Sequence, residues 1–433
     1  MFRLLKFPAF AQCCLSLSLV FVCGTCSIAE DAPSSLRAAS PVFDSQSLKD
    51  IDQTMQSFVD QGKLAGVLTL IARCGQVIQV GTYGQADLEA DKPMRRDSLF
   101  RIYSMTKPIT TAALLILYQE GKFELDDPVA RYLPQFADVQ VYSGTQGGQV
   151  QTVPASRSMT IRDLMRHTAG LAYGLFPASP VDAMYMKEKL LDRDRRLDQM
   201  IDKLVTLPLA AHPGEKWIYS ISVDVQGRLI EVLSGQALDE FFRTRIFQPL
   251  GMSDTFFTVP EDKLSRLTAN YGLKDGKLTA IDAPNRSEFA KPAAFFSGGG
   301  GLVSTADDYL RFAQMLLGGG ELDGVRILQP EIVELMTRNH LTESLVPIRV
   351  GLNKMEGMGF GLGVAVRVKV NDDEPESTLG EYGWAGAAST QFWVTPDQQL
   401  ICIAMTQLMP AKFDYALALR QQVLNAMAEP VGN

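Results

Sequence analysis

Cysteine is scarce in the part of this chain that a folded domain would contain. Of the 6 cysteines in 433 residues, only Cys74 and Cys402 lie beyond residue 26. Two cysteines are too few for a disulfide framework or a cysteine-rich metal cluster. Both fall in segments typical of strands, so one bridge in an oxidising compartment and two buried thiols remain open, with the thiols favoured.

Histidine is rarer still, with only His167, His212 and His340. Their spacing matches no metal-ligand pattern, so we expect no catalytic metal and no cofactor. The pentapeptide G-x-S-x-G is also absent, which excludes the nucleophile elbow of α/β-hydrolases and disfavours a Ser-His-Asp triad. If the chain is an enzyme that uses a hydroxyl nucleophile, its base must be lysine, tyrosine or a carboxylate.

Runs of basic residues are missing as well, and the net charge is −8. An acidic chain without Lys/Arg clusters is a poor ligand for nucleic acid or an anionic membrane surface. We therefore expect a small-molecule substrate and no nucleic-acid partner. The sequence leaves the oligomeric state unknown.

The first 29 residues have the pattern of a signal peptide. Arg3 and Lys6 precede an apolar run from residue 9 to 23, and Ser27-Ile28-Ala29 offers the small residues that a signal peptidase recognises. The run is too short and too rich in serine for a stable membrane span. We expect cleavage after Ala29 and export to the periplasm or the medium. A lipoprotein anchored through Cys23 or Cys26 is a less favoured alternative.

Strand patterns occur at both ends of the chain and helix patterns between them. A helix over 48–59 precedes a predicted hairpin (66–73 and 77–81); strands are expected again at 360–368, 390–394 and 400–405, before a last helix at 414–428. Helices are expected from Thr160, over 182–205 and from Ser222, and a loop or small hairpin over 142–157. This order predicts an α+β fold, with one antiparallel sheet built from both chain ends and flanked by helices.

The predicted domain organisation follows from that order. Residues 30–44 form a polar lead-in, residues 45–103 and 295–433 form an α/β domain, and residues 104–294 form an inserted, mainly helical domain. We expect the active site at the interface of the two domains. The segments 142–157, 176–195 and 340–357 are expected to shape its pocket.

The strongest chemical signal is Ser104-Met105-Thr106-Lys107, where a strand pattern gives way to a helix pattern. Residues three apart on a helix share a face, so the Lys107 amine can reach the Ser104 hydroxyl. A serine at a helix N-terminus also lies where backbone N–H groups favour developing negative charge. S-x-x-K alone is a weak signal, because a capping serine followed by a solvated lysine gives the same pattern.

Two further segments offer groups for the same site. Tyr219 stands directly before the helix that starts near Ser222, where a phenol can project into a cleft. Trp384 is flanked by small residues just before a strand, which lets the backbone approach a ligand closely. The glycines of 298–301 lack the lysine of a phosphate loop, and we interpret them as closely packed backbone near a cleft.

Taken in order, these segments resemble the serine β-lactamase and penicillin-binding-protein superfamily, and most of all its family VIII carboxylesterases, relatives of class C β-lactamases. The resemblance spans about residues 45 to 427. The segments that carry it are 104–107, 166–171 (RHTAGL), 213–220 (PGEKWIYS), 299–305 (GGGLVST) and 383–386 (GWAG). It implies the β-lactamase/DD-peptidase-like version of the predicted fold.

The resemblance also implies a role for each residue of the site. Ser104 would be the nucleophile, Lys107 the base or proton relay, and Tyr219 the group that moves protons to and from the leaving group. The backbone N–H groups of Ser104 and Ala387 would form the oxyanion hole, and Trp384, Ala385 and Gly386 would contact the substrate. A lysine with an ordinary pKa of about 10.4 is a poor base, so this reading requires burial to lower the pKa of Lys107.

Two departures from the β-lactamase pattern bear on the substrate. Tyr219-Ser220-Ile221 stands where those enzymes have Tyr-x-Asn, and Trp384-Ala385-Gly386 stands in place of Lys-Thr-Gly. The site therefore lacks the cation that would hold a lactam carboxylate. The expected function is that of a serine hydrolase cleaving short-chain or aromatic carboxylic esters through an acyl-enzyme on Ser104. The alternatives are a β-lactamase, a D-Ala-directed peptidase or acyltransferase, and, from another class, a catalytically silent ligand or cell-wall binder.

Overall fold

The fold is that of a computed structural model, which describes residues 43, 45–175, 179–370 and 374–428. The chain divides into two units, Met1–Val42 and Phe43–Asn433, and everything below concerns the second. The predicted signal peptide and nearly all of the polar lead-in lie outside the described residues. The proposed division of the remainder into an α/β and a helical domain stays a prediction.

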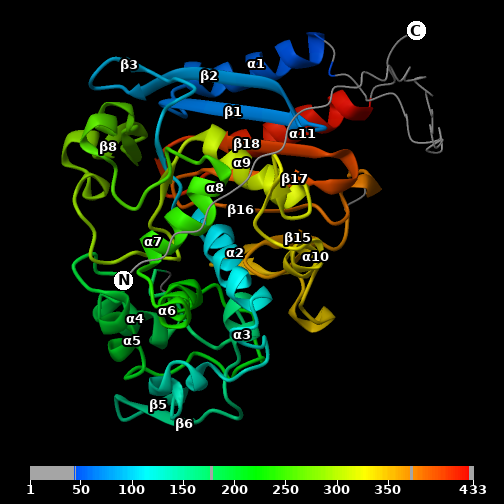
Figure 1. The fold of residues 1–433 in the computed structure, drawn as a ribbon. Helices are drawn as coiled ribbons and strands as arrows, with labels where there is room; N and C mark the ends of the chain where they lie inside the picture. The colour runs from blue at the N-terminus through cyan, green and yellow to red at the C-terminus, as the bar shows by residue number, and fades with distance from the viewer. Residues whose placement is uncertain (1–42, 44, 176–178, 371–373, 429–433) are drawn as a thin grey trace, which may run out of the picture. The chain divides into compact units, whose positions relative to one another are not determined.

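The centre of this unit is an eight-stranded antiparallel sheet, as the sequence predicts (Figure 1). Its strand order is β14-β15-β16-β17-β18-β1-β2-β3. The two chain ends meet at its middle, where β1 pairs with β18 and Leu70 lies opposite Ile403. The strands are β1 (Gly66–Arg73), β2 (Gln76–Asp87), β3 (Lys92–Pro93), β14 (Met358–Phe360), β15 (Ala365–Arg367), β16 (Tyr382–Ala385), β17 (Gln391–Thr395) and β18 (Leu400–Met405).

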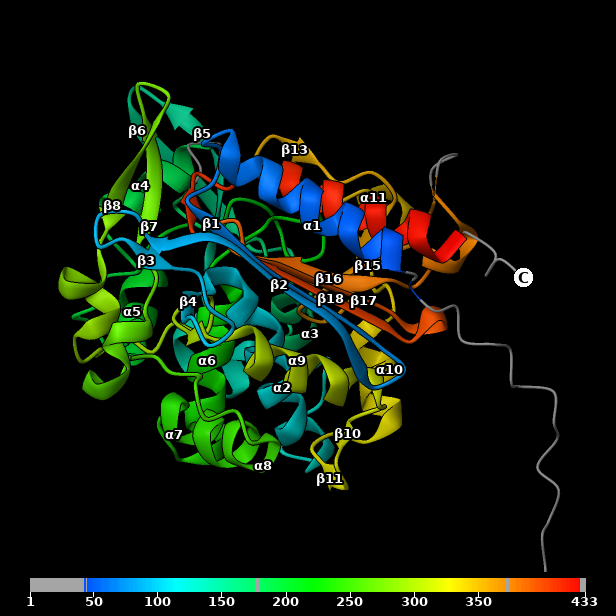
Figure 2. The ribbon, with the colours of Figure 1, turned by 90° about the horizontal axis from the view of Figure 1, so that it is seen from above.

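Helices cover both faces of the sheet. Side chains alternate between the faces of a strand, and on β1 Val67 and Ile71 join the apolar cluster beneath α1 (Ser45–Asp60) and α11 (Asp414–Ala428). Leu68 and Leu70 face the opposite way, into the larger core that includes α2 (Thr106–Gln119) and α9 (Ala306–Leu317). Figure 2 shows α1 and α11 side by side over the sheet.

The middle of the chain supplies most of the remaining helices and two hairpins. The helices are α3 (Ile161–Met165), α4 (Pro180–Lys187), α5 (Leu197–Leu204), α6 (Ser222–Ser234), α7 (Leu238–Phe242), α8 (Gln248–Leu250) and α10 (Pro330–Thr337). The hairpins pair β5 (Gln140–Gln146) with β6 (Gln149–Pro154) and β7 (Asn270–Lys274) with β8 (Lys277–Asp282). Short ladders are made by β4 (Phe100–Arg101), β9 (Val303–Ser304), β10 (Glu321–Leu322), β11 (Val325–Arg326), β12 (Arg349–Val350), β13 (Asn353–Lys354) and β19 (Leu408–Met409).

Two predicted elements are wrong in their extent. The helix expected over 182–205 is broken into α4 and α5, since Lys189 adopts a left-handed conformation with φ +48°. The strand expected over 360–368 folds back on itself as β14 and β15, because Gly363 turns the chain with φ +78°. In both places a local reversal interrupts a hydrophobic pattern that reads as continuous.

The two cysteines are free thiols, so the bridge left open by the sequence does not form. Cys402 is buried in β18, but Cys74 is exposed in the β1–β2 turn, so the expectation of two buried thiols is wrong for Cys74. Among the helices of the described residues, none is long and apolar enough to cross a membrane.

Candidate active site

Ser104 lies in a tight turn that leads from β4 into α2. Residues Tyr103–Met105 form one turn of 3-10 helix and α2 begins at Thr106, with Pro108 in its first turn. Tyr103, directly before Ser104, has φ +40°, a left-handed conformation that costs a residue with a side chain about 1 kcal/mol or more. Tyr309 helps to hold the turn by donating a 2.9 Å hydrogen bond to the carbonyl of Met105.

Lys107 reaches the Ser104 hydroxyl as its spacing predicts. Its Nζ lies 3.1 Å from Ser104 Oγ, 3.0 Å from the Tyr173 hydroxyl and 2.6 Å from the carbonyl oxygen of Gly299. An ammonium has three N–H groups, and these contacts offer an acceptor to each. Since the Lys107 side chain is fully buried, this arrangement compensates for the loss of water around its charge.

The pKa of Lys107 differs from the expectation drawn from the sequence. Burial lowers the pKa of Lys107. Tyr173 and Tyr219 would each be negative when ionised, and this effect raises the pKa of Lys107 by more than burial lowers it. The net pKa is raised, so the expected lowering is wrong. Burial likewise raises the pKa of Tyr173, and Lys107 offsets part of that rise. At neutral pH the resting site therefore holds the Lys107 ammonium beside the neutral phenol of Tyr173.

Tyr219 is brought to this lysine from its loop before α6. The Nζ of Lys107 lies 4.7 Å from the centroid of the Tyr219 ring. The hydroxyl of Tyr219 also accepts a 3.3 Å hydrogen bond from Nε1 of Trp384, in β16. The structure thus joins three separate predicted segments in one place: the start of α2, the loop before α6 and strand β16.

Tyr173 belongs to the same cluster and was missed by the sequence argument. It follows the 166–171 segment by two residues, bonds to Lys107, and packs its ring 5.2 Å from that of Tyr219. The signal available in the sequence was the position of this tyrosine, two residues beyond the 166–171 segment. Nothing in its local pattern separates it from a core tyrosine, because only the tertiary fold brings it to Lys107.

A buried carboxylate supports the lysine through the glycine-rich segment. Asp224 Oδ1 accepts hydrogen bonds from Ser297 Oγ at 2.5 Å and from the N–H of Gly299 at 3.1 Å, while the carbonyl of Gly299 binds Lys107. Oδ2 of Asp224 is buried and has no hydrogen-bond partner among the described residues. A Cβ on Gly299 would lie 2.4 Å from that oxygen, so glycine is required at this close approach, as the sequence suggested.

The segment after β16 packs against the backbone beside Ser104. A Cβ on Gly386 would lie 2.4 Å from the carbonyl oxygen of Ile102, two residues before Ser104. Gly386 is also tied to Thr390 by a 2.7 Å backbone hydrogen bond. Ala387, expected to supply an oxyanion donor, therefore follows a residue in close contact with the Ser104 turn.

None of the histidines touches Ser104. His167 is fully buried among the rings of Trp217, Tyr219 and Phe360, and its pKa is lowered well below the ordinary value by burial and by the charge of Lys107. The ring of His167 is therefore neutral at neutral pH and carries no charge at the end of α3. Within the described ranges no group of acidic, histidine or cysteine side chains could hold a metal ion.

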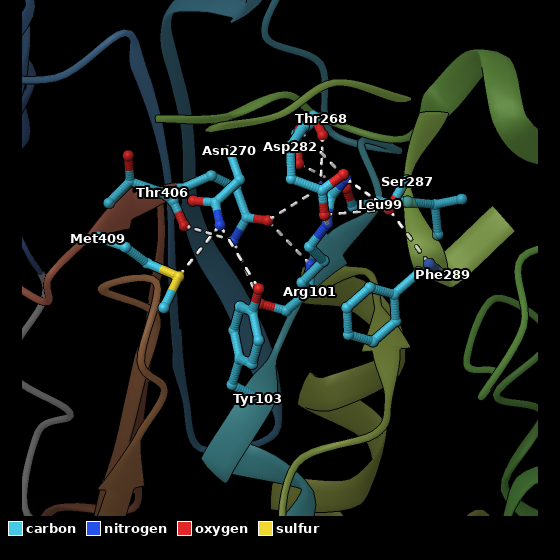
Figure 3. Close-up of polar contacts among 11 residues, drawn as sticks. Leu99, Arg101, Tyr103, Thr268, Asn270, Asp282, Ser287, Phe289, Thr406 and Met409 are labelled. Carbon is cyan, nitrogen blue, oxygen red and sulfur yellow. Dashed lines mark hydrogen bonds and ion pairs between the residues drawn. The ribbon is translucent and has the colours of Figure 1, made fainter. Parts of the chain in front are cut away.

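A buried arginine anchors the strand that leads into Ser104 (Figure 3). Arg101, in β4, is fully buried and forms a 2.7 Å ion pair with Asp282. Its guanidinium also bonds to the carbonyl of Thr268 at 2.6 Å and to Ser287 Oγ at 2.9 Å. These bonds fix β4 to residues on both sides of the β7–β8 hairpin, and hence fix the turn that carries the nucleophile candidate.

Comparison with known proteins identifies the family of this chain. A model of the Beta-lactamase family matches residues 51–426. Protein Rv1367c of Mycobacterium tuberculosis is 37% identical over 361 residues, covering 82% of this chain and 89% of that protein. Esterase EstB of Burkholderia gladioli is 33% identical over 278 residues, covering 60% of this chain and 68% of EstB.

Among solved structures, EstCE1, described as a hydrolase with promiscuous acyltransferase activity, superposes with a TM-score of 0.74 at 29% identity. The match covers 88% of this chain and 99% of EstCE1. The sheet, the helical region and the serine–lysine–tyrosine cluster thus occur on a chain whose relatives include esterases. This chain belongs to the beta-lactamase family, in its β-lactamase/transpeptidase-like fold.

Proposed function

We propose that this protein is a serine carboxylesterase that cleaves short-chain or aromatic esters through an acyl-enzyme on Ser104. The observation that carries the proposal is the 3.1 Å contact between Lys107 Nζ and Ser104 Oγ, in a cluster that also holds Tyr219. The esterases among its relatives support the same chemistry.

In the proposed first step, Ser104 Oγ forms a bond to the ester carbonyl carbon and its proton passes to the Lys107–Tyr219 pair, which must have lost one proton beforehand to act as the base. Because the pKa of Lys107 is raised, we assign the missing proton to the Tyr219 hydroxyl, so that the Tyr219 oxygen accepts the Ser104 proton while Lys107 stays an ammonium and relays it. Tyr219 then returns the proton to the departing alkoxide, and water releases the acyl group in a second step.

The oxyanion of each tetrahedral intermediate would be bound by the N–H groups of Ser104 and Ala387. Each such donor is typically worth about 3–4 kcal/mol of transition-state stabilisation. Trp384, Ala385 and Gly386 would line the acyl pocket and make it apolar. An apolar pocket favours esters that are neutral at the scissile bond over lactams that carry a carboxylate there. We also propose export directed by residues 1–29, with a small-molecule ester as the partner and no nucleic acid.

The test is mass spectrometry of the intact protein after incubation with p-nitrophenyl acetate, p-nitrophenyl butyrate and nitrocefin, together with labelling by a fluorophosphonate. We expect an acyl adduct on Ser104 from the esters, and loss of adduct, label and turnover in Ser104→Ala. Lys107→Ala should lose nearly all turnover. Ser234→Ala, at the far end of α6, is the matched control and should behave as wild type.

Two results would overturn the proposal. Wild type that neither turns over any ester nor takes the label would point to a silent binder. Rapid nitrocefin turnover with poor ester turnover would favour the β-lactamase alternative. Adding an alcohol as a second acceptor and analysing the products separates hydrolysis from acyl transfer, a distinction that the relatives leave open.

A further inference from the structure

Arg193 is a half-buried cation without an ionic partner. It lies between α4 and α5, and among the described residues no carboxylate and no hydrogen-bond acceptor meets its guanidinium; its Nη2 atom is buried and unpartnered. Burial lowers the pKa of Arg193, and nearby Glu288 and Tyr103 offset part of that fall. An arginine still keeps its charge at neutral pH. A buried N–H without an acceptor is destabilising unless a ligand satisfies it.

The guanidinium of Arg193 is connected to the Ser104 turn through two aromatic rings. Its central carbon is 4.6 Å from the centroid of the Phe289 ring, and that ring meets the Tyr103 ring edge-on at 5.9 Å. Tyr103 directly precedes Ser104. Figure 3 shows Tyr103 and Phe289 beside the Arg101 network, with Arg101 at 5.8 Å from the same Phe289 ring.

The backbone of Arg193 is hydrogen-bonded to the segment that leads to Gly299, whose carbonyl accepts a hydrogen bond from Lys107. Its carbonyl accepts hydrogen bonds from the N–H groups of Ala294 and Phe295 at 3.2 and 3.1 Å. Four residues further along, Gly299 binds Lys107. Arg193 is therefore hydrogen-bonded to the loop that contributes Gly299 to the active site.

Among the described residues, no acidic group near Arg193 forms an ion pair with it. Asp282 is paired with Arg101 at 2.7 Å, and Glu288 is paired with Lys291 at 2.6 Å. The neighbouring Asp194 is exposed and forms no ion pair with Arg193. The positive charge is thus uncompensated by an ion pair, and the Phe289 ring lies between it and Tyr103.

We propose that Arg193 is a specificity residue that binds a carboxylate carried by the substrate at a distance from the scissile ester bond. A guanidinium suits this group because its planar N–H pairs match the two oxygens of a carboxylate. The inference rests on the proposed esterase function and names its substrate class: acidic hemi-esters, whose scissile end is neutral and whose far end is an anion. The cation lost from the third β-lactamase motif is supplied here from a different element.

The test compares matched esters that differ only in the anion. The acyl-side pairs are p-nitrophenyl hemi-adipate with p-nitrophenyl hexanoate, and hemi-suberate with octanoate, each with an enzyme-free blank. The leaving-group pair is the butanoate of 3-hydroxybenzoate with that of 3-methylphenol. The wild type should prefer the acid of at least one pair, and the pair that responds shows which side of the ester faces Arg193.

Variants then assign the preference to one residue. Arg193→Gln should lower the acid-to-neutral ratio of kcat/KM about tenfold, through KM of the acid, because a charge-assisted bond is lost. Arg193→Lys should keep part of the ratio. Arg196→Gln is the charge-matched control, since Arg196 is exposed and already paired with Asp198 at 2.8 Å.

An acid-to-neutral ratio that is the same in wild type and Arg193→Gln for all three pairs would overturn the inference. The esterase proposal would survive that result, because neutral esters would still acylate Ser104. Absence of turnover with every ester would instead remove the proposed function itself. The two failures are therefore distinguishable in one set of assays.

Discussion

Replacing Tyr173 by phenylalanine removes one of the three acceptors around the Lys107 ammonium. The ring contact with Tyr219 is kept, but the 3.0 Å bond from Nζ to the hydroxyl is lost. Because Lys107 is fully buried, no water replaces that acceptor. Hydrogen bonds to charged groups contribute about 1.5–3 kcal/mol, and we expect the free energy of unfolding to fall by about that amount.

The same substitution should change the pH dependence of acylation. The bond to Tyr173 stabilises the charged form of Lys107, so its removal lowers the pKa of that amine. If acylation requires the Lys107–Tyr219 pair to accept the Ser104 proton, the acid limb of the pH–rate profile should move to lower pH. The assay is single-turnover release of p-nitrophenol across pH, together with urea unfolding at pH 7.

Tyr185→Phe is the matched control for this experiment. Tyr185 is also a buried tyrosine, but its hydroxyl donates to the neutral carbonyl of Pro208 at 3.3 Å and does not touch the lysine. It should lose about 0.5–1.5 kcal/mol of stability, with an unchanged pH–rate profile. An acid limb of Tyr173→Phe that stays in place or moves upward would refute the picture of a resting ammonium held by this phenol.

Two further predictions concern groups around the lysine. Asp224→Ala leaves the Gly299 N–H without its acceptor and should lower the free energy of unfolding by about 1–3 kcal/mol. Asp224→Asn should recover most of this loss in urea unfolding. It should still move the acid limb of the acylation pH–rate profile to lower pH, since Lys107 loses a nearby carboxylate. The pKa of His167 is depressed, so the stability from its neutral ring is present above about pH 6.5 and is lost as pH falls, by up to ~1.4 kcal/mol per pH unit. His167→Phe should reduce that slope between pH 6.5 and 5, and an unaltered slope would mean that the histidine is not buried as a neutral ring.

Local patterns were enough to predict much of the fold. Several elements carry a periodicity or a turn signal that acts within a few residues. They are helix α1, the β1–β2 hairpin, helix α6 with its Gly235 cap, and helix α11. The errors came where a reversal is short: Lys189 and Gly363 turn the chain without a signal strong enough to interrupt the apolar pattern. Tertiary packing decided those two points.

The sequence by itself determined that Ser104 and Lys107 would meet, because helix geometry joins residues three apart and needs no help from the rest of the chain. It could not determine the charge on that lysine. The pKa of Lys107 depends on Tyr173, Tyr219 and Gly299, which come from three other segments and reach it only after the sheet and the helical region have packed together. Electrostatic energies depend on distance and burial, and both are properties of the folded molecule.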